Sequence, residues 1–516
     1  MRALAFLLFA VTAVHAQPRT PALIPLPAEV EVRGGAPFMM AGTTPLVVDA
    51  GDAEAQRIAG VLAALVGNTV ETTPPVVEAA PGGTPAVRLR IDAEAGHGAE
   101  GYALDVSAAG VELVASAPAG LFYGVQTLRQ LLPARVEYEA ALYAPLPIPS
   151  VRIADAPRYA WRGMMLDVAR HFFGVADVER VIDLMALHKL NRLHLHLSDD
   201  QGWRIEIPSR PALARVGGRT EVGGGPGGYY TVEDVARIVR YAADRFVTVV
   251  PEIDLPGHTN AALVAIPELN CDGRARAPYT GTNVGFSTVC VEKEETWAFV
   301  EDVVASLAEQ FPSDVIHLGG DEVEELTAEQ YATFVTRAQA IVEAAGKRYA
   351  GWDDVAHAGL APGALVQVWR AQRADVARQV EAAVADGAQV VLSPSDRIYI
   401  DMKYDESTVL GLTWAGVNGV RDAYDWDPGA LLDVPEAAVL GVEAPLWAET
   451  ISTIRDVEFL AFPRLAGVAE IGWTPQSARS WSGYRARLGA FGPRWTALGV
   501  NHFRSPEVDW SLGGVE

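Results

Sequence analysis

The feature of this sequence that most constrains its fold is an alternation of short apolar runs with longer amphipathic stretches from about residue 158 onward. Eight apolar runs occur there, and each ends in polar or charged residues. Parallel strands that alternate with helices build either an open doubly wound sheet or a closed (β/α)8 barrel. Because no Gly-rich phosphate turn follows the first run, the sequence predicts an α/β fold with a (β/α)8 TIM barrel. The predicted strands are 163–168, 192–198, 247–253, 315–319, 348–352, 365–369, 389–393 and 439–446, with helices at 175–187, 232–245 and 296–311 among them.

The part of the chain before the barrel has a different pattern. Residues 102–106 and 110–115 alternate polar and apolar side chains around a small turn, and residues 119–132 repeat apolar side chains at helical spacing. A small α+β domain is therefore expected. Prolines at alternate positions from Pro145 to Pro149 then predict a stiff linker, because proline fixes φ and donates no hydrogen bond. The predicted boundaries are 18–150 for this domain, 151–500 for the barrel and 501–516 for a C-terminal tail.

Residues 1–16 have the pattern of a secretory signal peptide. One basic residue, Arg2, precedes an apolar run that ends with small residues at Val14 and Ala16, so cleavage after Ala16 is expected. An ordinary N-terminal helix is the alternative, since the run is too short to span a bilayer. No later segment has the pattern of a membrane span. The prediction is an exported protein, in a periplasm or in the medium.

The net charge limits which molecules the chain can bind, and its cysteines suggest a disulfide. The net charge of −24 and the pI near 4.8 disfavour binding to nucleic acid or to an anionic membrane, because the protein's field repels both. A neutral substrate suits this chain better. Cys271 and Cys290 are its two cysteines and lie in one Pro/Gly/Thr-rich stretch. In an exported chain they predict a disulfide that closes a loop, with two reduced thiols as the alternative.

Polar side chains follow nearly every predicted strand. The C-terminal ends of barrel strands form the active site in this architecture. Carboxylates hydrogen-bond to hydroxyls, and indoles stack on the C–H faces of pyranose rings, so their repetition at one rim predicts a sugar site. In chain order these groups are Asp167 and Arg170, 198–200, Glu252 with Asp254 and His258, Asp321 and Glu322, 352–354, Trp369 and Arg370, Tyr399 and Asp401, and Trp447 and Glu449.

The most specific local feature is HLGGDEVE, residues 317–324. Glycosidic cleavage usually needs one carboxylic acid and one carboxylate, and two glycines here free the chain to bring the adjacent Asp321 and Glu322 to one ligand. Mutual repulsion would raise one of the two pKa values and keep that group protonated as the acid. An Asp-Glu pair at a strand end is also a common helix cap, so this pair by itself does not establish catalysis.

Seven runs in order give the chain a resemblance to the β-N-acetylhexosaminidases of glycoside hydrolase family 20. The resemblance extends over nearly everything after the signal peptide, including the smaller domain before the barrel. The runs are GLFYGVQTLRQLL from Gly120, WRGMMLDVARHF from Trp161, KLNRLHLHLSDDQGWRIEI from Lys189, PEIDLPGH from Pro251, HLGGDEVE from His317, GLTWAG from Gly411 and APLWAET from Ala444.

This resemblance implies catalysis in which the substrate's own 2-acetamido oxygen attacks the anomeric carbon. Glu322 then corresponds to the general acid and base, and Asp321 to the residue that orients the acetamido N–H and stabilises the oxazolinium-like intermediate. Tyr399 corresponds to the hydrogen-bond partner of the acetamido oxygen. Asp199 and His258 resemble a relay behind Glu322. No cofactor and no metal ion are implied.

The resemblance also implies the sugar-binding residues of an exo-acting enzyme. Its substrate would be an oligosaccharide or glycoconjugate, such as chitin or another glycan, with a terminal β-linked N-acetylglucosamine or N-acetylgalactosamine. Arg162 would bind the 3- and 4-hydroxyls, with Asp401 and Glu449 on the 4- and 6-hydroxyls. The aromatic walls of the pocket would be Trp352, Trp369, Trp414 and Trp447.

Two alternatives stay open at this point. His194 and His196, with Asp199 nearby, could bind a metal ion in a metal-dependent barrel hydrolase. A catalytically inactive, sugar-binding relative would have the same fold, although the intact Asp321-Glu322 pair argues against it.

Overall fold

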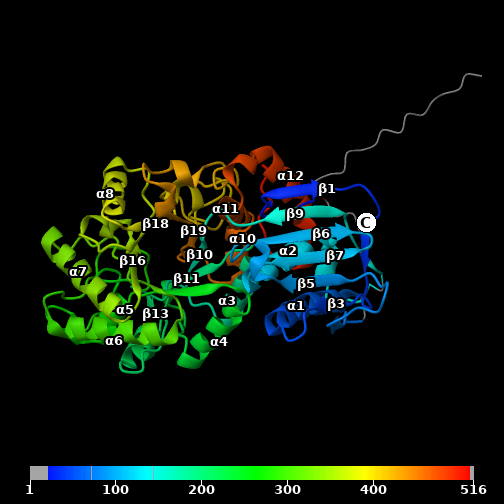
Figure 1. Cartoon of the computed structure of the whole chain (residues 1–516). Coiled ribbons are helices and arrows are strands. Elements are labelled where there is room, and N and C mark those ends of the chain that lie inside the picture. The colour runs from blue at the N-terminus through cyan, green and yellow to red at the C-terminus, as the bar shows by residue number, and fades with distance from the viewer. Residues whose placement is uncertain (1–20, 71, 143, 512–516) are drawn as a thin grey trace, which may run out of the picture.

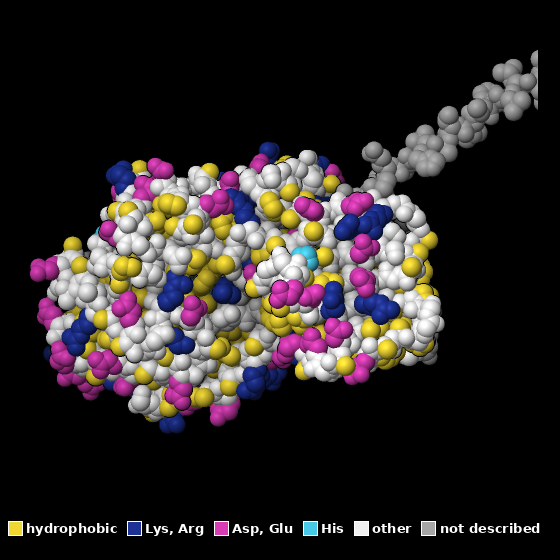
Figure 2. Space-filling view, viewed as in Figure 1, with side chains coloured by type: hydrophobic (Ala, Val, Ile, Leu, Met, Phe, Trp, Pro, Cys, Tyr) yellow, Lys and Arg dark blue, Asp and Glu magenta, His cyan; other side chains and the backbone are white. Residues whose placement is uncertain are grey.

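The computed structural model describes residues 21–511 except 71 and 143, so the predicted signal peptide lies outside the described residues. A smaller N-terminal domain and a larger barrel lie side by side (Figure 1). Asp and Glu side chains are scattered over both domains on the face shown in Figure 2, as the net charge of −24 leads one to expect. Within the described part of the chain, no helix has the length and apolar character needed to cross a membrane.

The larger domain is a closed barrel of eight parallel strands, so the predicted (β/α)8 fold is confirmed. The last strand pairs with the first, with Gly441 opposite Trp161, and this pairing closes the barrel. Nearly every strand residue is buried because side chains fill the barrel on one face and helices cover the other. In order around the barrel, the strands are β10 (Trp161–Asp167), β11 (Arg192–His196), β14 (Thr248–Glu252), β15 (Val315–His317), β16 (Arg348–Trp352), β17 (Leu365–Val368), β18 (Gln389–Leu392) and β19 (Val439–Leu446).

Helices cover the outside of the barrel at most connections, but the alternation is less regular than predicted. The β16–β17 connection has only a 3-10 turn, Asp353–His357, and the β18–β19 connection has only the short α9 (Ser395–Ile398) among short turns. The β18–β19 connection instead carries Tyr399, Leu412 and Trp414 of the pocket described below. The other helices are α3 (Val175–Leu187), α4 (Val232–Ala243), α5 (Asn260–Ala265), α6 (Glu294–Gln310), α7 (Ala328–Ala344), α8 (Ala374–Ala385), α10 (Ile454–Ala461), α11 (Arg464–Trp473) and α12 (Trp481–Ala497).

The N-terminal domain is the predicted α+β unit, built on a seven-stranded mixed sheet. Helices α1 (Ala53–Val70) and α2 (Pro118–Leu131) pack on it. The strand order is β1 (Glu29–Val32), β9 (Val151–Asp155), β6 (Tyr102–Ser107), β7 (Gly110–Ala115), β5 (Val87–Ile91), β3 (Leu46–Val48) and β4 (Val76–Val77). A separate two-stranded sheet pairs β2 (Phe38–Met40) with β8 (Leu146–Ile148), and β12 (Ser198–Asp199) pairs with β13 (Gly202–Trp203) beside the barrel.

The predicted domain boundary at residue 150 and the proline linker are both corrected. Residues 151–155 form β9, which pairs with β1 and β6 inside the N-terminal sheet. The segment around Pro147 is strand β8, because a short two-stranded sheet tolerates a proline where a central strand would not. The domain therefore extends to Asp155, and the barrel begins at Trp161.

The two domains share a polar and aromatic interface. Asp155 accepts hydrogen bonds from Tyr102 (2.6 Å), Lys189 (3.0 Å) and the indole of Trp473 (2.8 Å). The Lys189 ammonium also lies 4.3 Å from the centre of the Trp473 ring. Because Lys189 and Trp473 belong to the barrel and Asp155 to the N-terminal sheet, this cluster joins the domains below the barrel.

The C-terminal segment is part of the folded domain as far as it is described. Phe503 donates its backbone N–H to the carbonyl of Phe462, and Val508 is buried. The prediction of a separate tail over 501–516 is therefore wrong for residues 501–511. The apolar side chains Phe503, Val508 and Trp510 were the sequence signal that this segment packs.

The predicted disulfide between Cys271 and Cys290 is confirmed. It closes the base of a long loop between α5 and α6. The loop folds back onto the barrel, since Thr259 donates its backbone N–H to the Ser287 hydroxyl at 2.8 Å and Gln201 donates its side-chain N–H to the carbonyl of Gly281 at 3.0 Å. These bonds place the tip of the loop at the pocket mouth.

Candidate active site

A pocket of about 230 Å³ opens at the C-terminal ends of the barrel strands, where the fold predicts the site. Nine of the twelve residues predicted to act in catalysis or sugar binding line it. The residues that line the pocket are Arg170, His258, Thr282, Val284, Asp321, Glu322, Trp352, Trp369, Tyr399, Leu412, Trp414, Trp447 and Glu449.

The carboxyl pair at the centre of the pocket depends on two glycines. Gly319 and Gly320 follow β15 with positive φ angles of 62° and 94°, and a Cβ on Gly319 would lie 1.8 Å from the Asp254 carboxylate. This turn releases the chain from the strand ladder, so that the adjacent Asp321 and Glu322 both face the pocket. Glu322 itself has φ 54°, a left-handed conformation that strains a non-glycine residue and that occurs most often at functional sites.

His258 connects the carboxyl pair to a deeper carboxylate. Its Nε2 lies 3.5 Å from Glu322 and 3.7 Å from Asp321, and its Nδ1 lies 3.4 Å from Asp199. Like Glu322, His258 has a left-handed backbone, with φ 53°. Asp199 does not line the pocket but lies directly behind His258, so the predicted arrangement of Asp199, His258 and Glu322 is present as a row of contacts.

The two adjacent carboxyls differ in proton affinity. Burial raises the pKa of Asp321 to about 7, and the nearby charge of Glu322 adds to this shift while His258 opposes it. The contact with His258 holds the pKa of Glu322 below its usual value, against the effect of burial. Burial would lower the pKa of His258, but Asp199 and Asp254 raise it well above its usual value. The repulsion predicted from the sequence therefore acts on Asp321, and the proton nearest Glu322 is held by His258.

Aromatic rings form most of the pocket wall. Trp352 and Trp447 pack with their centres 5.6 Å apart, and Trp369 stacks on Tyr399 at 6.3 Å with an interplanar angle of 17°. Trp414 stands edge-on to Trp369 at 5.8 Å and is 56% exposed, so it forms the outer rim. The walls suit the C–H face of a sugar ring and an N-acetyl methyl group.

Two more carboxyls lie at the base of the pocket. Among the described residues, neither oxygen of the Asp401 side chain has a hydrogen-bond partner, and the same is true of Oε2 of Glu449. Burial, together with the charge of Glu449, raises the pKa of Asp401 well above its usual value. Asp401 is buried and does not line the pocket, whereas Glu449 does. Buried oxygens without partners are suited to accept hydrogen bonds from sugar hydroxyls.

The prediction for Arg162 is wrong. Arg162 is the second residue of β10, so it lies at the opposite end of the barrel from the pocket, and it is fully buried. Its guanidinium donates to Glu100 at 2.7 and 3.1 Å and to the carbonyls of Tyr159 and Lys189. Because all of these partners are fixed parts of the domain interface, Arg162 has a structural role.

Arg170 is the arginine that lines the pocket; the sequence analysis gave the sugar-binding role to Arg162 but placed Arg170 at a strand end. It follows the other end of the same strand, ion-pairs with Asp199 at 2.7 Å and Asp167 at 3.3 Å, and lies 4.8 Å from the centre of the Trp447 ring. Burial opposes its charge, but Asp199 and Asp167 hold the pKa of Arg170 well above its usual value. Its position after a predicted strand was the available signal.

The histidines considered as metal ligands are engaged in hydrogen bonds with carboxylates. His196 uses Nδ1 toward Glu252 at 2.5 Å and Nε2 toward Asp199 at 3.0 Å. His194 uses Nδ1 toward Glu443 at 2.8 Å. Both nitrogens of His196 therefore face carboxylates in this structure. Among the described residues, His194 groups with Glu252 and His317, whereas His196 groups with Asp199 and Asp254, so the predicted set of His194, His196 and Asp199 is not brought to one position.

The mouth of the pocket includes three residues that the sequence analysis did not assign to the site. Thr282 and Val284 come from the disulfide-closed loop, and Leu412 comes from the long β18–β19 connection. None of the three is a catalytic residue type, so nothing in the residues themselves predicted contact with the pocket. Only the folding back of both loops brings them to the rim.

A carboxyl pair beside a histidine at the top of a barrel, within a cavity walled by indoles, is characteristic of enzymes that hydrolyse glycosides. The comparisons with known proteins narrow this class. The family model described as "Glycosyl hydrolase family 20, catalytic domain" matches residues 159–476, and that of "Glycosyl hydrolase family 20, domain 2" matches residues 20–156. The chain belongs to glycosyl hydrolase family 20.

Individual relatives agree with this assignment. A β-N-acetylhexosaminidase of Cellulomonas fimi is 44% identical over 95% of this chain and 97% of its own length. The structure of the family 20 β-N-acetylhexosaminidase from Streptomyces coelicolor A3(2) is 50% identical, covers 96% of this chain and 100% of that chain, and has a TM-score of 0.93. A mutant Streptomyces plicatus β-hexosaminidase in complex with its product, N-acetylglucosamine, is also 50% identical, covers 96% of this chain and 99% of that chain, and has a TM-score of 0.92.

Proposed function

We propose that this protein is an exo-acting β-N-acetylhexosaminidase that removes terminal non-reducing β-linked N-acetylglucosamine or N-acetylgalactosamine. The observation that carries the proposal is the placement of Asp321, Glu322 and Tyr399 together in one aromatic-walled pocket. A small pocket that ends on the packed barrel interior suits the end of a glycan rather than its middle. The similarity to characterised β-N-acetylhexosaminidases supports the same substrate class.

In the first chemical step, the acetamido oxygen of the substrate attacks the anomeric carbon while Glu322 protonates the glycosidic oxygen. The bond from the anomeric carbon to the leaving oxygen breaks, and an oxazolinium ion forms on the sugar. Asp321 accepts the acetamido N–H and balances the positive charge of this ion. Tyr399 donates its hydroxyl to the acetamido oxygen and holds it in line for attack. Proximity of this internal nucleophile replaces an enzyme nucleophile.

In the second step, the Glu322 carboxylate takes a proton from a water molecule, which attacks the anomeric carbon as the oxazolinium ring opens. The product has the same β configuration as the substrate. His258, 3.5 Å from Glu322, is placed to take back the proton that Glu322 receives from water in the second step, just as it is placed to pass a proton to Glu322 before the first. The raised pKa of His258 means that this proton is present near neutral pH.

Hydroxyl recognition falls to the polar groups at the base of the pocket. Arg170 takes the role that the sequence analysis gave to Arg162, since its guanidinium is at the pocket surface and Asp199 and Asp167 fix its orientation. Glu449 lines the pocket and has a buried oxygen that can accept a hydrogen bond from a sugar hydroxyl, whereas Asp401 does not reach the pocket surface and interacts with Glu449 through its charge. The indole rings around them pack on the apolar face of the ring.

The direct test is hydrolysis of p-nitrophenyl N-acetyl-β-D-glucosaminide and its galactosaminide counterpart, with the anomeric configuration of the first product followed by NMR. Retention of configuration, and strong inhibition by a thiazoline mimic of the intermediate, are the expected results. Turnover of neither substrate would leave a sugar-binding protein without activity. Equal inhibition by the thiazoline and by free N-acetylglucosamine would contradict substrate assistance.

The destination and natural substrate of the protein are part of the same proposal. The signal-peptide pattern of residues 1–16 and the disulfide support export to a periplasm or the medium, where chitin fragments and other glycans occur. N-terminal sequencing of the protein recovered outside the cytoplasm should begin at Gln17. Product analysis on chitin oligosaccharides and glycoprotein glycans would identify which chains it trims.

A further inference from the structure

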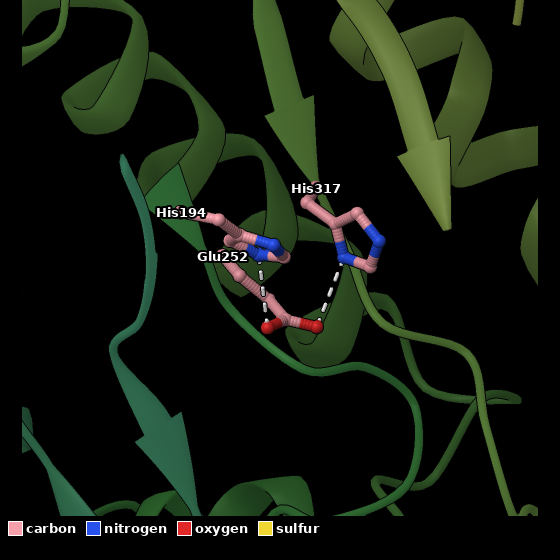
Figure 3. Close-up of side chains that lie close together, drawn as sticks. All are labelled: His194, Glu252 and His317. Atoms are coloured by element: carbon pink, nitrogen blue, oxygen red, sulfur yellow. Dashed lines mark ion pairs between the residues drawn. The ribbon is translucent and has the colours of Figure 1, made fainter. Parts of the chain in front are cut away.

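Beneath the pocket, the carboxylate of Glu252 is surrounded by nitrogen atoms from three neighbouring strands. Its Oε1 lies 2.9 Å from the indole nitrogen of Trp352 and 2.9 Å from Nδ1 of His317. Its Oε2 lies 2.5 Å from Nδ1 of His196 and 3.1 Å from Nε2 of His194. Figure 3 shows this carboxylate between His194 and His317, with both contacts drawn. Glu252 is fully buried, so it depends on these four groups in place of water.

One of these contacts leads to the wall of the pocket. Trp352 is 1% exposed and lines the pocket beside Trp447, where the acetamido group of the substrate is expected. An indole has a single N–H donor, and Trp352 gives it to Glu252. This bond therefore fixes the rotation of the ring about its side-chain bonds.

A second contact leads to the acid. His196 joins Glu252 to Asp199 at 3.0 Å, Asp199 lies 3.4 Å from His258, and His258 lies 3.5 Å from Glu322. The result is a row of alternating carboxylates and imidazoles from Glu252 to the general acid. Burial would raise the pKa of Glu252, but His196, His317 and His194 hold it well below its usual value. Glu252 and Asp199 raise the pKa of His196 well above its usual value against burial, so this part of the row is ionised.

We propose that Glu252 is a positioning residue for both halves of the reaction: it orients Trp352 against the acetamido group and, through His196 and Asp199, sets the charge that His258 presents to Glu322. This inference rests on the proposed hexosaminidase activity and extends it to a side chain that does not reach the pocket surface. It explains why one strand end, Glu252 to His258, supplies both a buried carboxylate and the relay histidine.

Several charged groups surround this row, and they determine in which direction the pKa of Glu322 should shift when Glu252 loses its charge. His194, His196 and His317 face Glu252 directly, and Asp254 and Asp321 act on the same region through their charges. Arg170, Asp199 and His258 act on Glu322. Because Asp199 still favours the protonated form of His196, removing the negative charge of Glu252 makes this region more positive and favours ionisation of the nearby carboxyls, including Glu322. The general acid would then lose its proton at lower pH.

The test is Glu252→Gln in the full-length enzyme, with p-nitrophenyl N-acetyl-β-D-glucosaminide as substrate. The expected result is a fall in kcat of about tenfold to a hundredfold, the usual size of effect when a hydrogen-bond partner that orients a functional histidine is removed. The basic limb of the kcat/KM profile should move to lower pH. Glu252→Asp retains the charge and should leave that limb close to its wild-type position while kcat still falls.

Glu470→Gln is the matched control, because Glu470 is also fully buried and is bound by Arg487 and Tyr424 far from the pocket. Its kcat should stay within about twofold of wild type. The basic limb of its kcat/KM profile should stay at the wild-type pH. A Glu252→Gln enzyme with wild-type kcat and pH limb would overturn the inference. So would a Glu470→Gln enzyme with the same loss and the same shift, since that would indicate a general structural effect.

Two narrower variants keep the inference testable if Glu252→Gln does not fold. Trp352→Phe retains a ring but removes the N–H, and should raise KM several-fold without moving the pH limb. His196→Gln should move the limb with little change in KM. A His196→Gln enzyme with an unaltered limb and kcat overturns the relay half. Absence of turnover by the wild-type enzyme, in contrast, would contradict the proposed function itself.

Discussion

The two ends of the barrel contain buried carboxylates in opposite situations. At the domain interface, Asp155 is bound by Tyr102, Lys189 and Trp473, and Glu100 by Arg162 and Asn191. At the pocket, oxygens of Asp321, Asp401 and Glu449 have no hydrogen-bond partner among the described residues.

The difference separates two uses of a buried charge. A carboxylate with all of its donors in place holds the domains together. A buried carboxyl without donors lowers the stability of the folded chain, and the enzyme retains it because the substrate supplies the missing hydrogen bonds. Substitutions at the two ends should therefore change different quantities: rate at the pocket, and stability at the interface.

The largest effect is expected at the pocket end, for Glu322→Gln. Loss of the acid should lower kcat by about a thousandfold, equivalent to roughly 4 kcal/mol in the barrier. Stability and binding of N-acetylglucosamine should change little, because the glutamine preserves the shape of the pocket. Initial rates and calorimetric binding measure both. Glu325→Gln, an exposed change three residues along the same loop, is the control. A kcat near the wild-type value would remove Glu322 from its role.

The opposite outcome is expected at the interface, for Lys189→Met. It should destabilise the protein by about 3 kcal/mol, because Asp155 loses its cationic partner while both remain buried. The folded fraction should retain the wild-type kcat. Urea unfolding measures the loss, and Arg237→Met, which breaks an exposed pair with Glu179, serves as the control with no marked change expected. A large drop in kcat with normal stability would show that the domain interface contributes to catalysis and not to stability.

The disulfide-closed loop should affect both stability and substrate binding. Replacing Cys271 and Cys290 together with alanine should lower stability by about 3 kcal/mol through the freed loop. The same loop brings Thr282 and Val284 to the pocket mouth, so KM for longer glycans should rise more than KM for the nitrophenyl substrate. An equal change in both KM values would mean that the loop does not contact the glycan beyond its terminal sugar.

At the pocket end of the barrel, the stability of the protein should also depend on pH. The pKa of Asp321 is raised to about 7 in the folded protein, so this group stabilises the fold below its unfolded value near 3.8 and loses that contribution as pH rises toward 7. Asp321→Asn removes this dependence. Relative to wild type, the variant should become progressively more stable between about pH 4 and pH 7, by up to roughly 4 kcal/mol for about three pKa units at about 1.4 kcal/mol each, and the difference should be constant above that. Urea titrations at several pH values measure the curve, and a difference that stays flat across this range would show that Asp321 has an ordinary pKa.

Much of the fold could be read from the sequence because each barrel strand is a local pattern. All eight strands were predicted, since a short apolar run followed by polar residues describes a strand buried on both faces. The domain boundary was missed because Pro147 and residues 151–155 look like a linker in isolation. They become strands only by pairing with Phe38–Met40 and with β1 and β6, which lie far away in the chain.

The site was predicted well where a motif is contiguous and poorly where a residue's role depends on the direction in which it points. Arg162 and Arg170 lie at the two ends of one strand, and only the second is at the C-terminal rim. The strand-end rule applied to this chain selects Arg170, whereas the resemblance alone suggested Arg162. The loop residues Thr282 and Val284 carried no signal because contact with the pocket is their only distinguishing property, whereas Leu412 lies in the same run as the predicted Trp414.

The sequence by itself determined the barrel, the adjacent Asp321 and Glu322, and the aromatic character of the pocket, because each is encoded in residues that are neighbours in the chain. The tertiary structure alone decided which carboxyl of the pair has the raised pKa, which arginine reaches the pocket, and that Glu252 lies among four nitrogen atoms. The physical reason is that proton affinity and hydrogen bonding depend on distances of a few ångströms, and folding sets those distances between residues that are far apart in the sequence.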